Sequence, residues 1–517
     1  MNAFSRRGAC PALSVPMQTG DGLLVRLNPV AGGPSSGGPT SGGPTSGGPT
    51  SGGLSPKLLI GLAESALRHG NGIMEVTARG SLQIRGLTTD SATRLAAEVD
   101  ALDIAVRTGV PVEIGPLAGI DPQEIADPRP LAERIRAAID EAGLAPMLGP
   151  KVSVIVDGCG QLTMDSVTAD VRLAAVRVDA GVRWRVSVAG DGWNGRPLVT
   201  ADEGSACDIT VAALRMVAEK GREAHARDLT ERQLVSLAGW LCSTSLREAP
   251  PSVLPVISPS RGEITLPPMV SPISGVGKEK PAPKLPISPP EGEMSGRTEG
   301  GASRKPIGLF PLAGDATALG IALPYGSMPA EKIIALAQHA LALGTSEIRL
   351  APGRALLFLG HPPAANQPLQ HTATALGFVT APTDPRTRIA ACSGTPACAS
   401  GRIATRDIAE TIATENADIL DFTLHISGCA KGCAHPALAT LTIVGGENGA
   451  GLVVNATAKA LPAGYRPGYD AARGIGRVAA MIRSARYQGE TAAACLTRLG
   501  PAGIAEAYRQ AQTEKRK

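Results

Sequence analysis

Four of the nine cysteines in this 517-residue chain lie close together in sequence, in two pairs. Five residues separate Cys392 from Cys398, three separate Cys429 from Cys433, and 30 residues lie between the pairs. Four thiolates at such spacings suit a cubane iron–sulfur cluster, which needs four soft ligands around one centre. A structural zinc site is a weaker interpretation, because zinc knuckles usually keep both pairs tighter.

Ordinary buried thiols are a third interpretation of these four cysteines. It is disfavoured because they fall within 42 residues among Gly394, Gly428 and Gly432, which allow close backbone approach. We expect the remaining cysteines to be core or surface thiols: Cys10, Cys159, Cys207, Cys242 and Cys495.

The segment that follows Cys398 predicts a helix over Ile403–Thr414. Ala404, Ile408 and Ile412 share one face of this helix, so it can pack behind the cysteines. Its amino end points toward them, where backbone N–H groups and the helix dipole would stabilise a negatively charged cluster or a bound anion.

Charge and composition exclude several classes of protein. Lys and Arg exceed Asp and Glu by only four residues, so no overall field attracts nucleic acid or an anionic membrane. No apolar run approaches the roughly 18 residues of a membrane span, and no signal peptide is evident. The chain is therefore expected to be cytoplasmic. Because it also has an odd number of cysteines, we do not expect a disulfide framework.

Two stretches have compositions that do not build a packed core. Residues 32–53 repeat Gly-Gly-Pro-Thr-Ser and predict a disordered insertion between a strand and a helix. Residues 250–305 are rich in proline and predict a semi-extended linker.

The remaining chain is internally duplicated. The pattern Leu62-Ala63-x-x-Ala66-Leu67-x-x-Gly70 returns as Leu336-Ala337-x-x-Ala340-Leu341-x-x-Gly344. Each copy follows an apolar strand and precedes a strand pair, which gives the order strand, helix, strand, strand. We expect the two halves to pair into one sheet.

A mixed α/β segment follows each copy and completes the predicted organisation. The fold class is α/β (α+β), with half-domains at 1–128 and 306–380, α/β halves at 129–249 and 381–517, and the linker at 250–305. Gly190-Asp-Gly-Trp-Asn-Gly195 matches a dinucleotide fingerprint, but Arg196-Pro197 follows it where a helix should begin. We therefore predict a glycine-rich hairpin or connection there, and no nicotinamide site.

The cysteine pattern, the duplicated architecture and Thr77-x-Arg79-x-x-x-Gln83-x-Arg85 resemble the sirohaem-dependent nitrite and sulfite reductases. Within that superfamily, other phrases are similar to the precorrin-3B synthases of cobalamin biosynthesis. These phrases are Arg7-Gly-Ala-Cys10-Pro11, Gly20–Arg26, Ala322-Leu-Pro-Tyr-Gly326 and Ser427–Pro436. The resemblance covers nearly the whole chain except the repeat tract and the linker. It implies two ferredoxin-like half-domains and two cluster-domain halves.

The resemblance also implies a tetrapyrrole site. The reductases hold a carboxylate-ringed sirohaem in a cleft lined by Arg and Lys, and precorrin-3A is a similar but metal-free tetrapyrrole. Arginine suits such a cleft because its planar fork pairs with carboxylates through two hydrogen bonds. The best candidates are Arg26, Arg79 and Arg85, and the weaker ones are Lys151, Arg349, Arg354 and Arg388.

The implied chemistry is that of an oxidoreductase. The family is a dioxygen-dependent monooxygenase that hydroxylates precorrin-3A at C20, after which a γ-lactone closes. Cys433 stands where the reductases bridge cluster and sirohaem, but a metal-free substrate offers no iron to bridge. A separate mononuclear non-haem iron is therefore implied, with His425, His435 and Asp157 as candidate ligands.

NADH would act indirectly, through a reductase or ferredoxin that supplies electrons to the 4Fe-4S cluster. Two alternatives stay open at this stage. A nitrite or sulfite reductase would retain sirohaem, and a simple electron carrier would hold the cluster alone. The carrier leaves the large duplicated scaffold and the arginine-bearing hairpins unexplained.

Overall fold

The computed structural model describes residues 11–29, 53–106, 109–244 and 304–510. By its contacts the chain divides into a unit of Met1–Ala238 with Ser303–Lys517 and a unit of Gly239–Ala302, and the description below concerns the first. Most of the repeat tract, most of the linker and Cys10 lie outside the described residues, as does the side chain of Cys242. No helix among the described residues is long and apolar enough to cross a membrane.

Each copy of the duplicated module forms its own antiparallel sheet of five strands. The first has the order β1 (Met17–Thr19), β2 (Gly22–Leu27), β5 (Leu82–Leu87), β4 (Ile73–Val76) and β13 (Ser327–Pro329). The second has the order β11 (Gly308–Pro311), β12 (Thr317–Ala322), β15 (Ala355–Leu359), β14 (Glu347–Ala351) and β3 (Gly53–Leu54).

The halves therefore exchange edge strands, since β13 pairs with β4 and β3 pairs with β14. The prediction that they pair into one sheet is wrong. Two short strands, each just ahead of a helix, cross to the opposite half and satisfy the outer backbone groups of its sheet.

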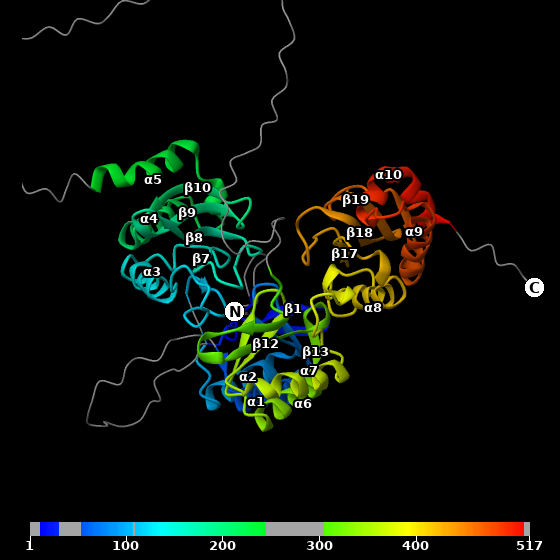
Figure 1. Ribbon diagram of the computed structural model, residues 1–517, viewed down its shortest axis with the longest axis horizontal. Coiled ribbons are helices and arrows are strands. Elements are labelled where there is room, and N and C mark those ends of the chain that lie inside the picture. The colour runs from blue at the N-terminus through cyan, green and yellow to red at the C-terminus, as the bar shows by residue number, and fades with distance from the viewer. Residues whose placement is uncertain (1–10, 30–52, 107–108, 245–303, 511–517) are drawn as a thin grey trace, which may run out of the picture. The chain divides into compact units, whose positions relative to one another are not determined.

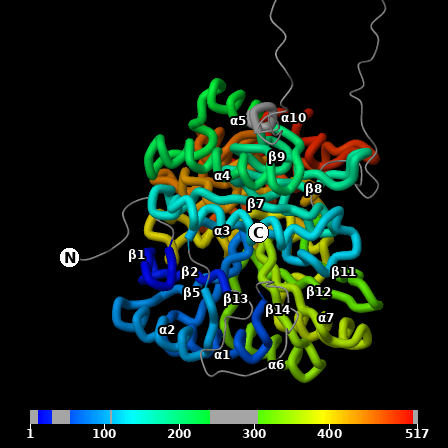
Figure 2. Tube along the Cα trace, turned by 90° about the vertical axis from the view of Figure 1, so that its left-hand side faces the viewer, coloured from blue at the N-terminus to red at the C-terminus, as the bar shows by residue number. Residues whose placement is uncertain are grey.

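Four helices cover these sheets, and α1 and α6 lie side by side against each other (Figures 1 and 2). They are α1 (Pro56–His69), α2 (Thr89–Ala101), α6 (Ala330–Ala342) and α7 (Asn366–Ala375). Ser55 caps α1 by accepting a hydrogen bond from the N–H of Leu58, as the Ser-Pro start predicts. The repeated Leu62 and Leu336 belong to one apolar core that spans both halves.

The first mixed α/β half contains a five-stranded sheet in the order β10, β9, β8, β7, β6. Strands β6, β7 and β8 run parallel, whereas β9 and β10 are antiparallel additions. The elements are β6 (Val112–Ile114), α3 (Arg129–Glu141), β7 (Val154–Asp157), β8 (Ala169–Val178), β9 (Gly181–Gly190), β10 (Arg196–Ala201), α4 (Glu203–Glu219) and α5 (Glu231–Thr244).

The second mixed half repeats this design, with β16, β17 and β18 parallel and β19 and β20 antiparallel. Its elements are β16 (Ile389–Ala391), α8 (Thr405–Glu415), β17 (Leu424–Ser427), β18 (Ala439–Gly446), β19 (Gly449–Ala456), β20 (Gly464–Arg466), α9 (Ala471–Ala485) and α10 (Ala492–Arg509). Helices α9 and α10 pack together beside the sheet, around buried Ile443 and Tyr508 (Figure 1).

The glycine-rich phrase Gly190–Gly195 forms the turn of the β9–β10 hairpin. Asp191 holds this turn by accepting hydrogen bonds from the backbone N–H groups of Trp193 and Asn194. No helix opens from Gly195, because β10 begins at Arg196, so the predicted hairpin is confirmed.

Candidate functional site

The four clustered cysteines lie in two loops at one edge of the second α/β sheet. Cys392 directly follows β16, and Cys429 follows β17 after one glycine. Because β16 and β17 are parallel neighbours, their loops emerge at the same edge. Burial raises the pKa of Cys433, and the nearby thiols of Cys392, Cys429 and Cys398 raise it further.

Glycines let these two loops pack backbone against backbone. A Cβ built on Gly428 would lie 3.2 Å from the Cα of Gly394 and 3.5 Å from Cys392 Sγ. The N–H of Gly428 donates to that sulfur at 3.2 Å. Gly394 has φ of 60°, a conformation that favours glycine. The close approach expected from these glycines is therefore present.

Helix α8 begins beside the cysteine loop, two residues later than its predicted start. The Thr405 hydroxyl donates to the carbonyl oxygen of Cys392, which fixes the first turn against the loop. Ala404, at the N-cap, provides no side-chain cap, so N–H groups of the first turn have no such partner. This is the placement that the sequence predicts for a helix stabilising negative charge.

The residue types in these loops are those of a four-cysteine iron–sulfur site, since such clusters are held by four thiolates. Among the described residues, no group of three His, Cys, Asp or Glu side chains is close enough to hold a single metal ion.

A buried histidine lies next to these loops. His425 on β17 is fully buried opposite Thr442 on β18, and within the described part of the chain neither its ring nitrogens nor the Thr442 hydroxyl has a hydrogen-bond partner. Burial, with His435 and Arg354 nearby, lowers the pKa of His425 to about 4. The ring is therefore neutral, the form in which imidazole binds metals.

Of the three predicted iron ligands, the structure brings only two together. The ring centroids of His425 and His435 are 5.7 Å apart, and His435 Nε2 lies 2.9 Å from the carbonyl oxygen of Leu438. Asp157 lies at the end of β7 in the other α/β half, where its carboxylate accepts the N–H groups of Cys159 and Met164. Burial raises the pKa of Asp157.

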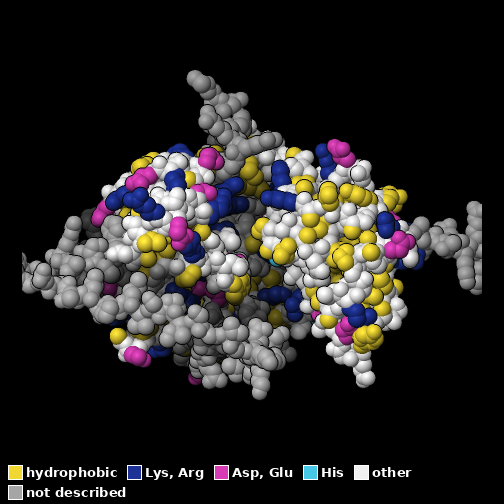
Figure 3. Space-filling view, turned by 90° about the horizontal axis from the view of Figure 1, so that it is seen from above, with side chains coloured by type: hydrophobic (Ala, Val, Ile, Leu, Met, Phe, Trp, Pro, Cys, Tyr) yellow, Lys and Arg dark blue, Asp and Glu magenta, His cyan; other side chains and the backbone are white. Residues whose placement is uncertain are grey.

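A large cavity of about 1470 Å³ lies between the first ferredoxin-like half and the first α/β half. Three of the predicted substrate residues line it, namely Arg26, Arg79 and Lys151. The space-filling view in Figure 3 shows Lys and Arg side chains beside a hollow between the two upper lobes of the molecule. The lining contains five Lys and Arg residues and an equal number of Asp and Glu residues. A cavity of this size suits a large ligand, and its cations can pair with carboxylates at individual positions.

The cavity also contains basic residues that the sequence analysis did not single out. Arg222, His225 and Arg227 come from the connection between α4 and α5. His225 Nδ1 lies 3.0 Å from buried Asp170, which fixes the ring. Three basic side chains within six residues were the available signal, but they lie far in sequence from the other candidates.

The remaining predicted arginines lie elsewhere. Arg349 shares a smaller cavity of about 120 Å³ with Arg79 and pairs with Glu347 at 2.8 Å. Arg388 lies in a short 3-10 turn beside Lys305, where burial and this neighbouring cation lower the lysine pKa to about 8.

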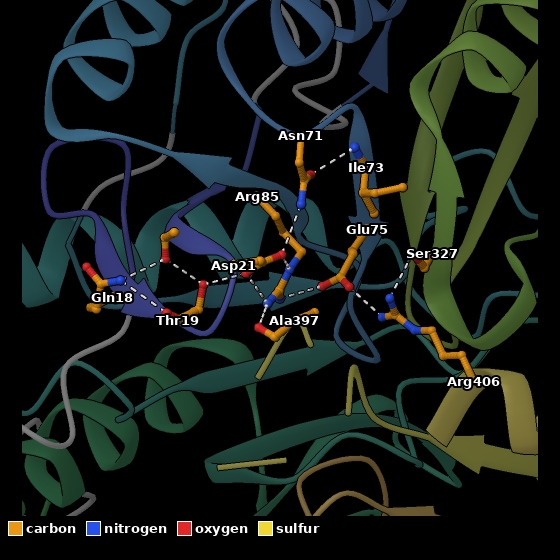
Figure 4. Close-up of polar contacts among 11 residues, drawn as sticks. Gln18, Thr19, Asp21, Asn71, Ile73, Glu75, Arg85, Ser327, Ala397 and Arg406 are labelled. Atoms are coloured by element: carbon orange, nitrogen blue, oxygen red, sulfur yellow. Dashed lines mark hydrogen bonds and ion pairs between the residues drawn. The ribbon is translucent and has the colours of Figure 1, made fainter. Parts of the chain in front are cut away.

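Arg354 and Arg85 lie near the cysteine loops and do not line the large cavity. Arg354 has φ of 68° and donates to the carbonyl oxygen of Ala434 at 3.4 Å, in the loop after Cys433. Burial lowers its pKa, and the nearby cation Arg406 does so as well. Arg85 is 4% exposed and hydrogen-bonds a backbone oxygen of the Cys392–Cys398 loop (Figure 4).

The fold is of the nitrite/sulfite reductase type. Residues 45–102 match the nitrite/sulfite reductase ferredoxin-like half domain. The solved structure of the NirA protein of Mycobacterium tuberculosis superposes with a TM-score of 0.64 over 93% of this chain and 84% of that chain. At 18% identity this likeness establishes the architecture, which confirms the predicted duplicated fold.

A relative of higher sequence identity shows the family to which the chain belongs. The precorrin-3B synthase of Sinorhizobium sp. is 36% identical over 510 residues, which cover 98% of this chain and 96% of the relative. The chain belongs to the precorrin-3B synthase family.

Proposed function

We propose that the chain is a precorrin-3B synthase, an oxidoreductase of cobalamin biosynthesis. In this proposal it uses dioxygen to hydroxylate precorrin-3A at C20, and a γ-lactone then forms. The observation that carries the proposal is the 36% identity to a precorrin-3B synthase over almost the full length of both chains.

The large cavity is the proposed substrate site. Arg26, Arg79 and Lys151 would bind carboxylates of the tetrapyrrole, and Arg222 and Arg227 also line the cavity. Arg79 is already held by Glu113 at 2.9 Å and by Ser153 at 2.9 Å. This bracing orients its guanidinium before substrate arrives, which lowers the entropy lost on binding.

The cysteine loops are the proposed site of a 4Fe-4S cluster held by Cys392, Cys398, Cys429 and Cys433. Such a cluster supplies single electrons when bound. NADH would be the indirect source, through a ferredoxin or a reductase. His425 and His435 are the candidate imidazole ligands of a mononuclear non-haem iron, since they are adjacent and His425 is neutral and without a partner among the described residues.

The test begins with anaerobic purification, iron and sulfide analysis, cluster EPR and extraction of any bound tetrapyrrole. We expect four sulfides per chain, iron in excess of four, no sirohaem, and conversion of precorrin-3A only when dioxygen and a reductant are both present. Stoichiometric sirohaem with nitrite or sulfite turnover would contradict the proposal and place the chain among the reductases. Conversion of precorrin-3A without dioxygen would contradict the monooxygenase.

A further inference from the structure

We propose that Arg85 is a positioning residue for the iron–sulfur cluster, which it serves by holding the loop of Cys398 against the first ferredoxin-like half. The inference rests on the cluster of the proposed function. It gives Arg85 a different task from Arg79, although both belong to the motif Thr77-x-Arg79-x-x-x-Gln83-x-Arg85.

Arg85 is occupied by partners within the chain (Figure 4). Its Nε and Nη2 donate to the two carboxylate oxygens of Asp21, both at 3.0 Å, and its Nη1 donates to Glu75 at 3.3 Å. The Arg85 side chain is only 5% exposed. Although burial alone would raise it, hydrogen bonds from Arg85 and Thr19 lower the pKa of Asp21. The pair is therefore charged, and removing one partner would leave an uncompensated buried charge.

The same guanidinium reaches the cluster loop. Arg85 Nη2 also donates to the carbonyl oxygen of Ala397, the residue before Cys398. The N–H of Gly20 donates to this oxygen as well, at 3.2 Å. A Cβ on Gly20 would lie 2.5 Å from the carbonyl oxygen of Pro396 and 2.8 Å from the carbonyl carbon of Cys398. The loop therefore packs directly against the β1–β2 turn, and the charged side chain of Arg85 holds it there by a hydrogen bond.

A second branch of the same network reaches helix α8. Glu75, which accepts from Arg85, also pairs with Arg406 in the first turn of α8. Arg406 Nη1 donates to the Ser327 hydroxyl at 3.0 Å (Figure 4). Its neighbour Thr405 holds the carbonyl oxygen of Cys392. Two of the four cysteines are therefore fixed through residues that meet at Glu75 and Arg85.

The network also extends toward the large cavity. With its amide oxygen turned toward Arg26, Gln83 accepts from Arg26 Nη2 at 2.8 Å and donates to Glu75 at 3.0 Å. Arg26 lines the cavity. The residues of the motif thus have different roles. Arg79 faces the cavity, whereas Gln83 and Arg85 connect the cavity lining to the cysteine loop.

The experiment compares Arg85→Met and Arg85→Lys with the wild-type chain. The control is Arg94→Met, which removes an arginine of an exposed ion pair on α2 of the same half. Each protein is reconstituted anaerobically and assayed for iron and sulfide, for the EPR spectrum and midpoint potential of the reduced cluster, and for the rate of cluster loss to a chelator. Thermal unfolding reports whether each variant folds.

We expect Arg85→Met to lose its cluster about tenfold faster, the size of effect that residues supporting metal ligands commonly have. Its EPR spectrum or potential should shift, Arg85→Lys should recover part of both effects, and Arg94→Met should match wild type. A folded Arg85→Met with wild-type cluster retention, spectrum and potential would overturn the proposal, whatever happens to tetrapyrrole binding. If Arg85→Met does not fold, Asp21→Asn, which leaves Arg85 in place, is judged by the same measurements. Absence of a cluster from the wild-type chain would instead overturn the proposed function, and this inference with it.

Discussion

The two mixed α/β halves have the same strand order but hold the ends of their parallel strands by different chemistry. In each half the loop after the first strand crosses to the glycine that follows the second strand. The N–H of Ile125 donates to the carbonyl oxygen of Gly158 at 2.8 Å, and the N–H of Arg402 donates to that of Gly428 at 2.8 Å. These bonds match in kind, partner and length.

The residues around this shared bond differ. In the first half, side-chain carboxyl groups accept backbone N–H groups: Glu124 that of Gly119, Asp121 that of Gln161 and Asp157 that of Cys159. In the second half, thiols occupy the same loops. Cys159 follows Asp157-Gly158 as Cys429 follows Ser427-Gly428, but no second cysteine is near it in sequence. The comparison teaches that the fold provides two equivalent edges that differ in residue type, with carboxyl groups at the first and thiols at the second, so the proposed cluster would require the second.

Replacing Cys398 by Ser should have the largest effect of the substitutions proposed here, because it removes one of the four proposed soft ligands of the cluster. We expect loss of the cluster and of precorrin-3A turnover together, measured by iron and sulfide content and by activity under anaerobic handling. Cys159→Ser, at the equivalent edge of the first half, is the matched control and should retain both. A fully active, iron-replete Cys398→Ser would contradict the ligand set.

Adding one methyl group at the equivalent glycines should separate folding from cluster binding. A Cβ on Gly158 would lie 2.4 Å from the carbonyl oxygen of Ala126, a backbone atom that cannot easily move. We expect Gly158→Ala to lower the free energy of unfolding by about 1–3 kcal/mol, with unchanged iron per folded chain.

At the other edge, a Cβ built on Gly428 would lie 3.2 Å from the Cα of Gly394 and 3.5 Å from Cys392 Sγ. Gly428→Ala should therefore cost less stability and instead disturb the cluster spectrum. Urea unfolding and EPR of both variants check this pair of outcomes. Equal effects of the two substitutions on the cluster would show that the edges do not differ as described.

Substitutions in the large cavity should have a smaller effect, since each cation is one of several. Lys151→Met should weaken precorrin-3A binding about threefold to tenfold, because a partly solvated charged hydrogen bond is lost. Lys57→Met, on the exposed face of α1, serves as the control and should bind as wild type does. Equilibrium titration under anaerobic conditions measures both. Unchanged affinity in Lys151→Met would move the substrate away from this wall.

Much of this arrangement is predictable from local patterns. The repeated Leu-Ala helices, the strand pairs and α9 at Ala471–Ala485 follow from periodicity, and the cysteine spacing marks the two neighbouring loops that carry the four thiols. The strand exchange does not follow, because β3 and β13 have two and three residues, too few to show a period. Spacing also cannot tell that Arg79 faces the cavity while Arg85 is buried on Asp21, since this depends on contacts with distant segments.

The candidate site shows the same division between local and distant information. Arg222, His225 and Arg227 meet Arg26 and Lys151 only through the folded sheet, so no short-range signal connects them. Asp157 is a candidate iron ligand by residue type, yet in the structure its oxygens are taken up by backbone N–H groups of its own loop.

The smallest predicted effect is on the pH dependence of the free energy of unfolding, through a carboxyl group of the first half. Burial, opposed by the Gly119 N–H and aided by nearby Asp121, Asp127 and Asp157, raises the pKa of Glu124 to about 8. The folded chain therefore keeps a proton that the unfolded chain releases near its ordinary pKa of 4.5. Since the native state binds more protons in this window, the free energy of unfolding falls as pH rises from about 4.5 to about 8.

Glu124→Gln should remove this part of the pH dependence. Its amide oxygen can still accept the N–H of Gly119, and it carries no charge to bury. Because Glu124 is partly solvated, we expect the wild type to lose on the order of 1 kcal/mol more than the variant between pH 5 and pH 8. Urea unfolding across this range measures the difference, with Glu141→Gln at the exposed end of α3 as the control. Parallel profiles for wild type and Glu124→Gln would mean that the first edge does not hold a buried, protonated carboxyl in place of the thiols of the second.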